Sequence, residues 1–172
     1  MFSEIACYGQ DSTFDDILTT IFISAEQNVN CVALPSGFMG RVVEFLKDQR
    51  FAAVIDFPYG ISTTQVRLHE IILAIRHGAS LIDLVLNGSY LKEENWKKLE
   101  EDLKVCSTVC NENDVTLRPI LEYKLFSPRV VIKACEMLEK YNITTVINST
   151  GSIIDDPSDN AIICHSRQKN TS

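Results

Sequence analysis

An acidic residue lies within one of the most apolar stretches of the chain. Asp83 is the single charged residue of Leu81–Leu86, and the apolar character of this run (LIDLVL) predicts a strand buried on both faces. A buried carboxylate is costly unless it is paired. Asp83 is therefore predicted either to transfer protons or to serve as a structural acceptor for a neighbouring hydroxyl group or arginine.

Further polar groups follow two other predicted strands. Glu122 ends one of them, and Lys124 comes two residues later. Lys124 is either an amine nucleophile or a solvated loop lysine. Ser149, Thr150 and Gly151 follow another strand, where backbone N–H groups can hold an anion. The carboxyl ends of parallel strands are the usual active end of a barrel.

The histidines and cysteines do not form a metal-binding pattern. His69 and His77 are eight residues apart on a predicted helix, whereas a two-histidine site usually has a spacing of four. The six cysteines include no CxxC pair. We therefore predict no metal and no cofactor, and reduced, mostly buried thiols in an intracellular, cytoplasmic protein.

Charge and hydropathy exclude two classes of partner. The net charge is −7, and the densest group of lysines, Lys92–Lys104, is interleaved with acids that include Asp102, which predicts a solvated helix face. Nucleic-acid binding relies on clustered basic residues. No apolar run approaches the roughly 18 residues of a membrane span, and the N-terminus lacks the basic region of a secretory signal. No nucleic acid and no membrane are predicted as partners.

Short apolar runs, polar turns and helix-like stretches alternate along the chain, which is typical of βα units. The predicted strands are Ile5–Tyr8, Cys31–Leu34, Ala52–Phe57, Leu81–Leu86, Leu117–Glu122 and Thr144–Asn148. The predicted helices begin near Ser12 or Thr13, Ser36 or Gly37, Ser62-Thr63, Lys92 and Ser127-Pro128. The second of these helices is predicted to continue to about Asp48.

The number of units limits the architecture. Six βα units without a linker predict a single domain over residues 1–172, with 152–172 as a C-terminal helix or tail. A closed eight-stranded barrel needs about 250 residues. The chain therefore forms either a six-stranded open sheet or an incomplete barrel.

One segment resembles a known family. Phe51–Asn87 contains a strand that ends in Phe57-Pro58-Tyr59-Gly60, a helix start at Ser62-Thr63-Thr64, a Gly78-Ala79 stop, and the strand motif Ile82-Asp83-Leu84-Val85-Leu86-Asn87. In order and spacing these features resemble the third and fourth βα units of deoxyribose-phosphate aldolases. Weaker similarity extends over residues 4 to 151 and aligns Glu122 with a usual acidic position of the family. The resemblance implies an incomplete TIM-type (β/α) barrel, an α/β fold of about six parallel βα units.

The family's reaction requires groups that this sequence lacks. A lysine amine forms a Schiff base with the substrate carbonyl, and an aspartate and a second lysine assist by proton transfer and by lowering the pKa of the first lysine. Ile147 stands at the position of the Schiff-base lysine, and a one-residue shift of register places Asn148 there. Ala6 stands where the family has an aspartate in its first strand. Strands seven and eight, which carry the second lysine and the phosphate loops, have no counterpart.

With these departures from the family pattern, two hypotheses about function remain. The first is an aldolase-like domain without catalysis, a scaffold or interaction module in a homo-oligomer or larger assembly. The second is an active carbon–carbon lyase that cleaves 2-deoxyribose 5-phosphate to acetaldehyde and glyceraldehyde 3-phosphate, or a binder of sugar phosphates. Asp83 and Glu122 are the predicted remnants of the catalytic site, and Ser149, Thr150 and Gly151 are the predicted substrate-binding residues. An incomplete barrel has open sheet edges and an exposed apolar interior, so we expect a second copy, a partner protein or the segment 152–172 to cover them.

Overall fold

The computed structural model describes residues 3–9, 11–46 and 49–152. Its elements run in the order β1 (Glu4–Ala6), α1 (Phe14–Glu26), β2 (Cys31–Pro35), η1 (Ser36–Phe38), α2 (Met39–Val42), η2 (Val43–Phe45), β3 (Arg50–Ile55), α3 (Thr64–Arg76), β4 (Leu81–Val85), α4 (Gly88–Lys92), α5 (Trp96–Glu112), β5 (Thr116–Ile120), η3 (Tyr123–Leu125) and α6 (Pro128–Lys140). The C-terminal helix or tail predicted for 152–172 lies outside the described residues, apart from Ser152.

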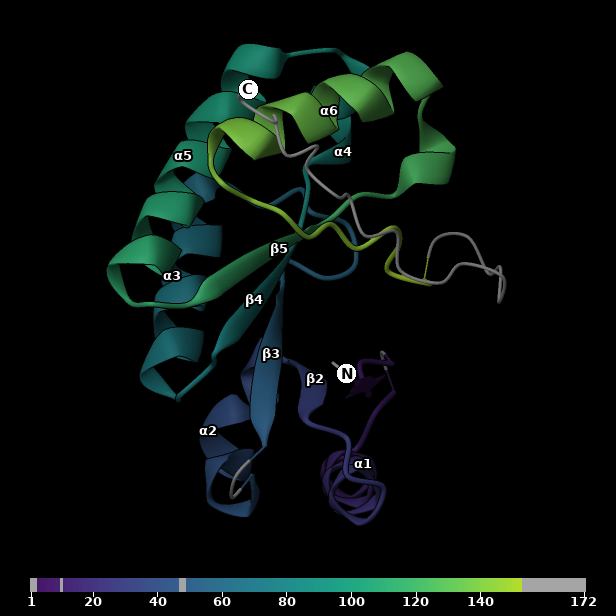
Figure 1. Ribbon diagram of the computed structural model, residues 1–172, viewed down its shortest axis with the longest axis vertical. Helices are drawn as coiled ribbons and strands as arrows, with labels where there is room; N and C mark the ends of the chain where they lie inside the picture. Colours follow the sequence, from purple (N-terminus) through teal and green to yellow (C-terminus); the bar gives the residue numbers. More distant parts are fainter. Residues whose placement is uncertain (1–2, 10, 47–48, 153–172) are drawn as a thin grey trace, which may run out of the picture.

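The strands form one parallel sheet in sequential order, β1-β2-β3-β4-β5 (Figure 1). Each strand pairs with its neighbour in the chain, and the register places Asp83 of β4 beside Arg118 of β5. Strands connected through helices and ordered in this way are those of a (β/α) barrel that does not close. The predicted α/β fold, an incomplete barrel, is confirmed.

The sixth predicted strand is much reduced. Of Thr144–Asn148, Ile147 alone forms a bridge, with Ile120. Three backbone hydrogen bonds hold this segment to the end of β5: Ile147 N–H donates to Pro119, Leu121 N–H to Ile147 and Tyr123 N–H to Asn148, at 2.8, 2.8 and 3.2 Å. The segment is paired on one side only within the described part of the chain.

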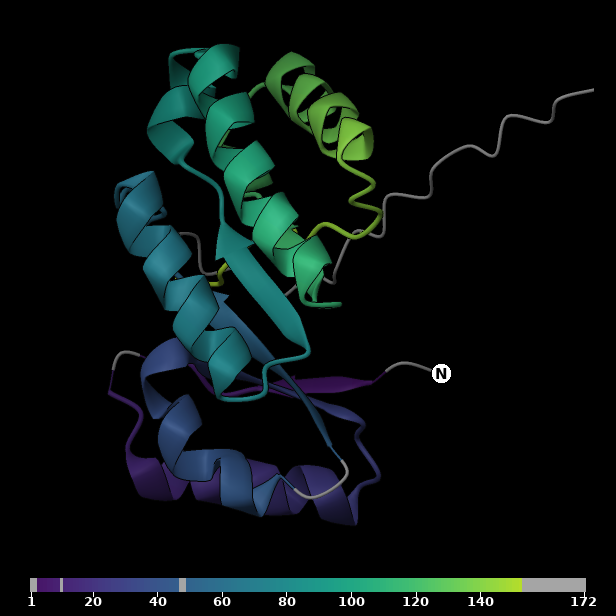
Figure 2. The same ribbon diagram turned by 90° about the vertical axis from the view of Figure 1, so that its left-hand side faces the viewer.

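The helices cover the outer face of the curved sheet. Figure 2 shows α3 and α5 side by side along this face, and α6 next to α5. Their starts follow ordinary capping chemistry. Thr13 accepts a hydrogen bond from Asp16 N–H while Asp16 accepts one from Thr13 N–H, which is a capping box at the start of α1. Ser127 caps α6, and Pro128 occupies its first position.

The second predicted helix is wrong in its length. In place of one helix from Ser36 to about Asp48, the chain forms three short pieces, η1, α2 and η2, between Ser36 and Phe45. Gly37 and Gly40 weaken helix propensity in this stretch. In addition, no side chain caps η1, α2 or η2. The other predicted helices are present as continuous helices, although the fourth begins at Trp96 after the separate short helix α4.

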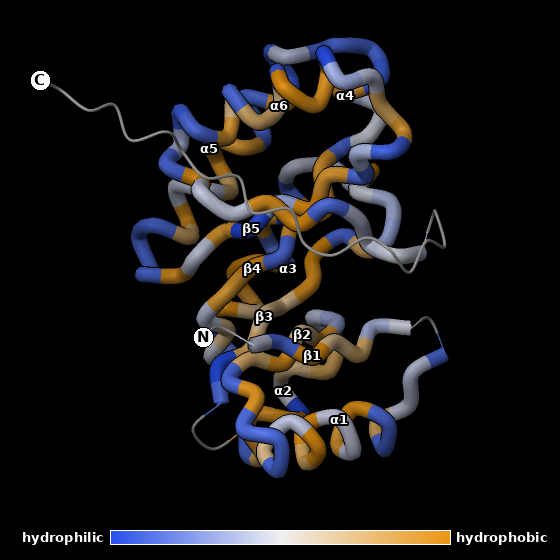
Figure 3. The backbone as a smooth tube through the Cα atoms, turned by 45° about the vertical axis from the view of Figure 1, so that its right-hand side comes forward, coloured by the Kyte–Doolittle hydropathy of each residue, from blue (hydrophilic) through white to orange (hydrophobic). Residues whose placement is uncertain are grey.

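Two apolar clusters lie on opposite faces of the sheet. The large one fills the space between strands and helices and includes Val32, Ile55, Ile71 and Leu103. The small one lines the inner face and consists of Cys31, Ala33, Ala52, Val54, Leu81, Val85 and Ile120, with Tyr8, Phe57 and Ile147 packed against it. The strands at the centre are accordingly coloured as largely hydrophobic in Figure 3. The inner face therefore has a core of its own, built mainly from small side chains.

The inner core changes one expectation about the open barrel. In the part of the chain that the structure describes, the large hydrophobic side chains that are exposed come from helices and loops, such as Phe22, Ile61 and Ile132, and none comes from a strand. The exposed apolar interior expected from an open barrel is not observed among these residues. In the same ranges, no helix combines the length and the apolar composition of a membrane-spanning segment.

Candidate active site

Asp83 is the centre of an ion cluster on the inner face. Its side chain is 2% exposed. Arg118 donates two hydrogen bonds to it, from Nε to Oδ1 at 2.7 Å and from Nη2 to Oδ2 at 2.8 Å. The same Nη2 donates to Glu4 Oε2 at 2.7 Å. Two carboxylates from β4 and β1 thus share one guanidinium from β5.

The surroundings of the cluster determine its protonation. Burial raises the pKa of Asp83 to about 6, and the hydrogen bonds and charge of Arg118 oppose this rise. Burial also raises the pKa of Tyr8, and the negative charges of Asp83 and Glu4 add to the effect. The Cys31 thiol donates to Glu4 Oε2 at 3.1 Å, and burial raises its pKa. At neutral pH Cys31 is therefore a protonated, unreactive thiol.

Glu122 holds the turn that follows the sixth predicted strand. It is 7% exposed, and its carboxylate accepts hydrogen bonds from Thr150 N–H at 2.6 Å and from the Ser149 hydroxyl at 2.9 Å. Gly151 N–H donates to the Ser149 hydroxyl oxygen at 3.0 Å, and Ser152 N–H donates to the Thr150 hydroxyl oxygen at 3.2 Å. The structure brings all four of these predicted site residues together. An incoming anion would have to displace the Glu122 carboxylate to use the same donors.

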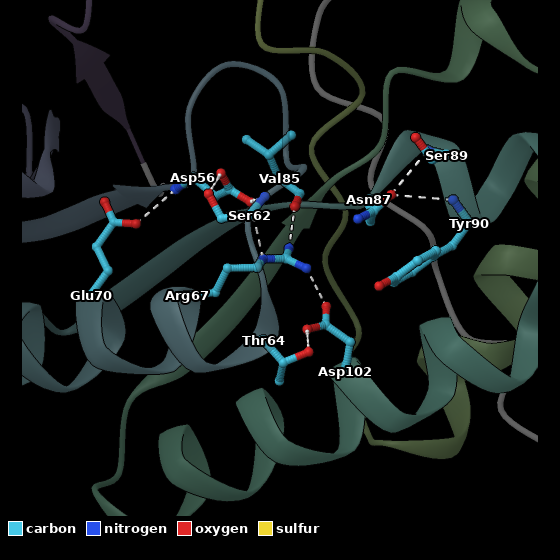
Figure 4. A network of polar contacts seen from close by, with 10 residues as sticks. All are labelled: Asp56, Ser62, Thr64, Arg67, Glu70, Val85, Asn87, Ser89, Tyr90 and Asp102. Atoms are coloured by element: carbon cyan, nitrogen blue, oxygen red, sulfur yellow. Dashed lines mark hydrogen bonds and ion pairs between the residues drawn. The ribbon is translucent and has the colours of Figure 1, made fainter.

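A second ion network lies on the helix side, at the carboxyl ends of β3 and β4 (Figure 4). Arg67 of α3 is fully buried. Its guanidinium donates to Asp102 of α5 and to the carbonyl oxygen of Val85 at the end of β4, and its Nε lies 3.3 Å from Asp56 Oδ2. Thr64 donates to the other oxygen of Asp102 at 2.8 Å. Arg67 thus connects two helices with the ends of two strands.

The turn after β3 is built around Asp56. Its carboxylate accepts from the hydroxyl and the N–H of Ser62, at 2.8 and 3.0 Å, and its N–H donates to Glu70 at 3.0 Å. Gly60 has a φ of +66°, and a Cβ at this position would lie 2.5 Å from the Leu86 carbonyl oxygen. This contact explains the glycine of the Phe57–Gly60 motif, because the turn packs directly on the end of β4.

The residues aligned with lost catalytic groups also have definite places. Ile147 packs against the inner apolar cluster together with Tyr8 and Phe57, whose rings are 5.0 Å apart. Ala6 lies in β1, and Glu4, two residues earlier, points to the same face of the strand. Lys124 lies in η3 with its Nζ 5.8 Å from the centre of the Tyr123 ring, and it is exposed. Both roles predicted for Lys124, nucleophile and solvated lysine, stay predictions.

Sequence reasoning missed several partners in these networks, Glu4 and Asp56 among them. Arg118 and Arg67 were not singled out, although each is an arginine within a predicted strand or helix with apolar neighbours. Asp102 was assigned to a solvated helix face, and this is wrong: it is 1% exposed and pairs with Arg67. Its spacing from Leu99, Leu103 and Cys106 on one helical face was the available signal.

The chemistry that the inner face can perform follows from these contacts. Both oxygens of Asp83 accept hydrogen bonds from Arg118. One of the two roles predicted for Asp83 was that of a structural acceptor for an arginine, and these contacts fit that role. A part for Asp83 or Glu122 in proton transfer stays a prediction, as does substrate binding by Ser149, Thr150 and Gly151. Among the described residues, no group of three or more histidine, cysteine, aspartate or glutamate side chains is arranged to hold a metal ion.

Fold and site together define an α/β chain of the aldolase type, with an acid on the fourth strand facing the inside of an unclosed barrel. The family model for DeoC/LacD family aldolases matches residues 5–143. The chain belongs to this family.

Similar proteins support the assignment. A deoxyribose-phosphate aldolase of Mycoplasmopsis pulmonis is 34% identical over 138 residues, which cover 79% of this chain and 62% of that protein. Two solved structures have the same fold: the aldolase QR15, with a TM-score of 0.82, 23% identity and coverage of 88% of this chain and 67% of that one, and the tetrameric deoxyribose phosphate aldolase of Aeropyrum pernix, with a TM-score of 0.79, 17% identity and coverage of 88% and 63%. The chain spans less than two thirds of the length of the first curated relatives that it matches.

Proposed function

We propose that this chain is an aldolase-family domain without carbon–carbon lyase activity, which acts as a scaffold or interaction module within a homo-oligomer or larger assembly. The observation that carries the proposal is the packing of Ile147 in the inner apolar cluster, at the position where the family carries its Schiff-base lysine. An isoleucine has no nucleophile, and a class I aldolase cannot form its covalent intermediate without an amine.

The state of Asp83 supports the same proposal. A proton-transfer acid must be able to reach the substrate. Here both of its oxygens accept hydrogen bonds from Arg118, and the side chain is almost completely buried. The aromatic pair Tyr8 and Phe57 packs against the same inner cluster. Substrate would have to displace both the guanidinium and this packing to reach the carboxylate.

The edges of the sheet support a role in assembly. Within the described residues, β1 pairs on one side only, with β2. A partly apolar groove of about 280 Å³, lined by residues that include Cys135, Leu138, Ile143 and Val146, runs beside α6. Unpaired strand edges and apolar grooves are surfaces on which other chains associate. Light scattering coupled to size-exclusion chromatography tests this part: we expect a mass above that of one chain, and a monomer would contradict self-association.

The alternative function is a lyase that cleaves 2-deoxyribose 5-phosphate to acetaldehyde and glyceraldehyde 3-phosphate. Its support is the identity with relatives named deoxyribose-phosphate aldolase. In this alternative an amine other than residue 147 would attack the substrate. The exposed Lys124, at the carboxyl end of the fifth strand, is the nearest candidate by its place in the fold. The turn at Ser149, Thr150 and Gly151 would hold the phosphate.

Borohydride trapping separates the two functions. The chain is incubated with 2-deoxyribose 5-phosphate and borohydride, and its intact mass is measured, with a catalytically active relative treated in parallel. We expect an adduct on the relative and none on this chain. An adduct here that disappears in Lys124→Arg but persists in the control Lys133→Arg would establish the lyase and its nucleophile.

Binding without catalysis has a different signature. A chain that holds sugar phosphate but lacks the amine would show a higher melting temperature with 2-deoxyribose 5-phosphate and no adduct. The matched variant is Gly151→Ala, because the turn adopts a φ of +71° there and no atom lies within 4 Å of the added Cβ. Loss of the ligand-dependent shift in this variant would assign the phosphate to the turn.

A further inference from the structure

The contact between Glu4 and Arg118 joins the two ends of the sheet. Glu4 lies in β1 and Arg118 in β5, the first and last strands of the sheet, 114 residues apart. These strands are not neighbours in the sheet, yet the side-chain atoms lie 2.7 Å apart. The sheet is thus curved enough for its outermost strands to meet across the inner face.

The strand that this contact holds is short and lies at the edge of the sheet. β1 contains three residues and is the shortest strand of the sheet. Among the described residues it pairs with β2 alone, Cys7 N–H donates to Ala33 at 3.0 Å, and Ser3 N–H donates to Asn30 at 3.1 Å. Short edge strands open locally at lower free-energy cost than the centre of a sheet.

Arg118 is itself held rigidly. It is 5% exposed and is fixed to Asp83 by two hydrogen bonds, a bidentate arrangement of the strongest kind. Its Nη2 is therefore presented at a fixed position to whatever approaches from β1. The Glu4 side chain is 24% exposed, so it is the member of the pair that can leave for water.

We propose that the Glu4–Arg118 ion pair is a clasp across the open barrel, which keeps β1 seated on β2 at the edge of the sheet. With the clasp closed, Ile5 of β1 and the following Cys7 pack against the large apolar cluster. With the clasp open, β1 can detach from β2 while the rest of the sheet stays folded. The part of the large cluster that Ile5 and Cys7 contact is then exposed, together with the free edge of β2.

Other groups around the pair do not replace it. The Cys31 thiol also donates to Glu4, at 3.1 Å, but a thiol is a weak donor. Tyr8 and Glu122 lie near the cluster and take part in its electrostatics, but Tyr8 lies beyond the end of β1 and Glu122 beyond the end of β5. Asp83 anchors Arg118 from β4 and not from the edge.

Hydrogen exchange of the full chain, followed by mass spectrometry, tests the clasp. In Glu4→Gln the charge is lost while the shape is kept. We expect the amides of residues 4–7 to exchange roughly tenfold faster than in the unmodified chain, while the amides of β3 and β4 stay unchanged. Glu101→Gln, which removes the exposed pair with Lys98, is the control and should leave the exchange of residues 4–7 unchanged.

Two results would overturn the proposal. One is unchanged exchange at residues 4–7 in Glu4→Gln. The other is an equal acceleration throughout the sheet, which would mean that the ion pair contributes to global stability and does not seat β1. Because Glu4 is partly exposed, its amide variant is expected to fold. A hydrophobic dye reports independently, and its fluorescence should rise in Glu4→Gln but not in the control Glu101→Gln.

Discussion

Two buried arginines lie on opposite sides of the same sheet. Arg67 lies on the helix side and contacts Asp102, Asp56 and the end of β4, which belong to consecutive βα units. Arg118 lies on the inner side and contacts Asp83 on the neighbouring strand and Glu4 on the distant edge. Arg67 therefore stabilises the contact between successive units, whereas Arg118 connects the ends of an unclosed barrel. A buried arginine can thus join neighbouring units, as Arg67 does, or hold together distant strands of a curved sheet, as Arg118 does.

Replacing Arg67 is expected to have the largest effect. In Arg67→Leu the Asp102 carboxylate stays 1% exposed and loses its cation. Breaking one side of a buried pair costs about 3 to 5 kcal/mol. The measurement is the free energy of unfolding in urea. Adding Asp102→Asn to Arg67→Leu should recover part of the loss, and a single variant within about 1 kcal/mol of the unmodified chain would contradict the assigned role of Arg67.

Replacing Arg118 is expected to cost somewhat less. Arg118→Met leaves Asp83 buried without its partner, but Glu4 can turn to water, so we expect a loss of about 3 kcal/mol. Asp83→Asn in the same chain removes the stranded charge and should restore part of the stability. If the double variant is less stable than Arg118→Met by urea unfolding, the buried charge of Asp83 is not the source of the loss.

The stability contributed by the inner cluster around Asp83 and Arg118 should depend on pH. The folded-state pKa of Asp83, about 6, lies above its ordinary value of 3.8. The folded state therefore favours the protonated acid, and the contribution of Asp83 to stability is greatest below about pH 4, declines as the pH rises to about 6 and is constant above that. Relative to Asp83→Asn, the decline should amount to about 2 to 3 kcal/mol. Unfolding curves across this window, with Asp83→Asn as the flat reference, provide the test.

An exposed ion pair gives the smallest effect and a baseline for the two arginines. Lys98 and Glu101 of α5 lie 3.6 Å apart, and their side chains are 58% and 53% exposed. Exposed pairs of this kind contribute less than about 1 kcal/mol. Glu101→Gln should change the free energy of unfolding by no more than about 0.5 kcal/mol, with less difference at high salt. A larger change would mean that the exposure of an ion pair does not predict how much it contributes to the free energy of unfolding.

The sequence was sufficient to predict the strands, because strands buried on both faces are continuously apolar. AAVIDF and LIDLVL are such runs, and β3 and β4 occupy them within two residues at each end. The segment Ser36–Phe45 was less predictable because its glycines and missing caps divide a periodic pattern into short pieces. Nothing in the apolar pattern of Thr144–Asn148 indicated that Ile147 alone would form a bridge.

The candidate site could be predicted only in part, for a related reason. Asp83 was identifiable because a charge within an apolar strand requires explanation, and an arginine partner was one of the two readings. The identity of that arginine depends on the register that sets Asp83 opposite Arg118. The contact of Glu4 with Arg118 depends on the curvature of the whole sheet. Neither the strand register nor the curvature of the sheet can be predicted from a local sequence pattern. Glu122 and the Ser149–Gly151 turn were predicted separately, and their contact is again a product of the fold.

The sequential strand order has a consequence for how the chain folds. Each strand pairs with the one before it, and the contact between Asp83 and Arg118 spans 35 residues, whereas the one between Glu4 and Arg118 spans 114. Contacts between near neighbours in the chain form fast, and closing a longer loop costs additional chain entropy that grows slowly with its length. The units can therefore assemble one after another on local contacts. The first and last strands can then meet once the strands between them are in place, and their contact completes a domain that is otherwise already formed.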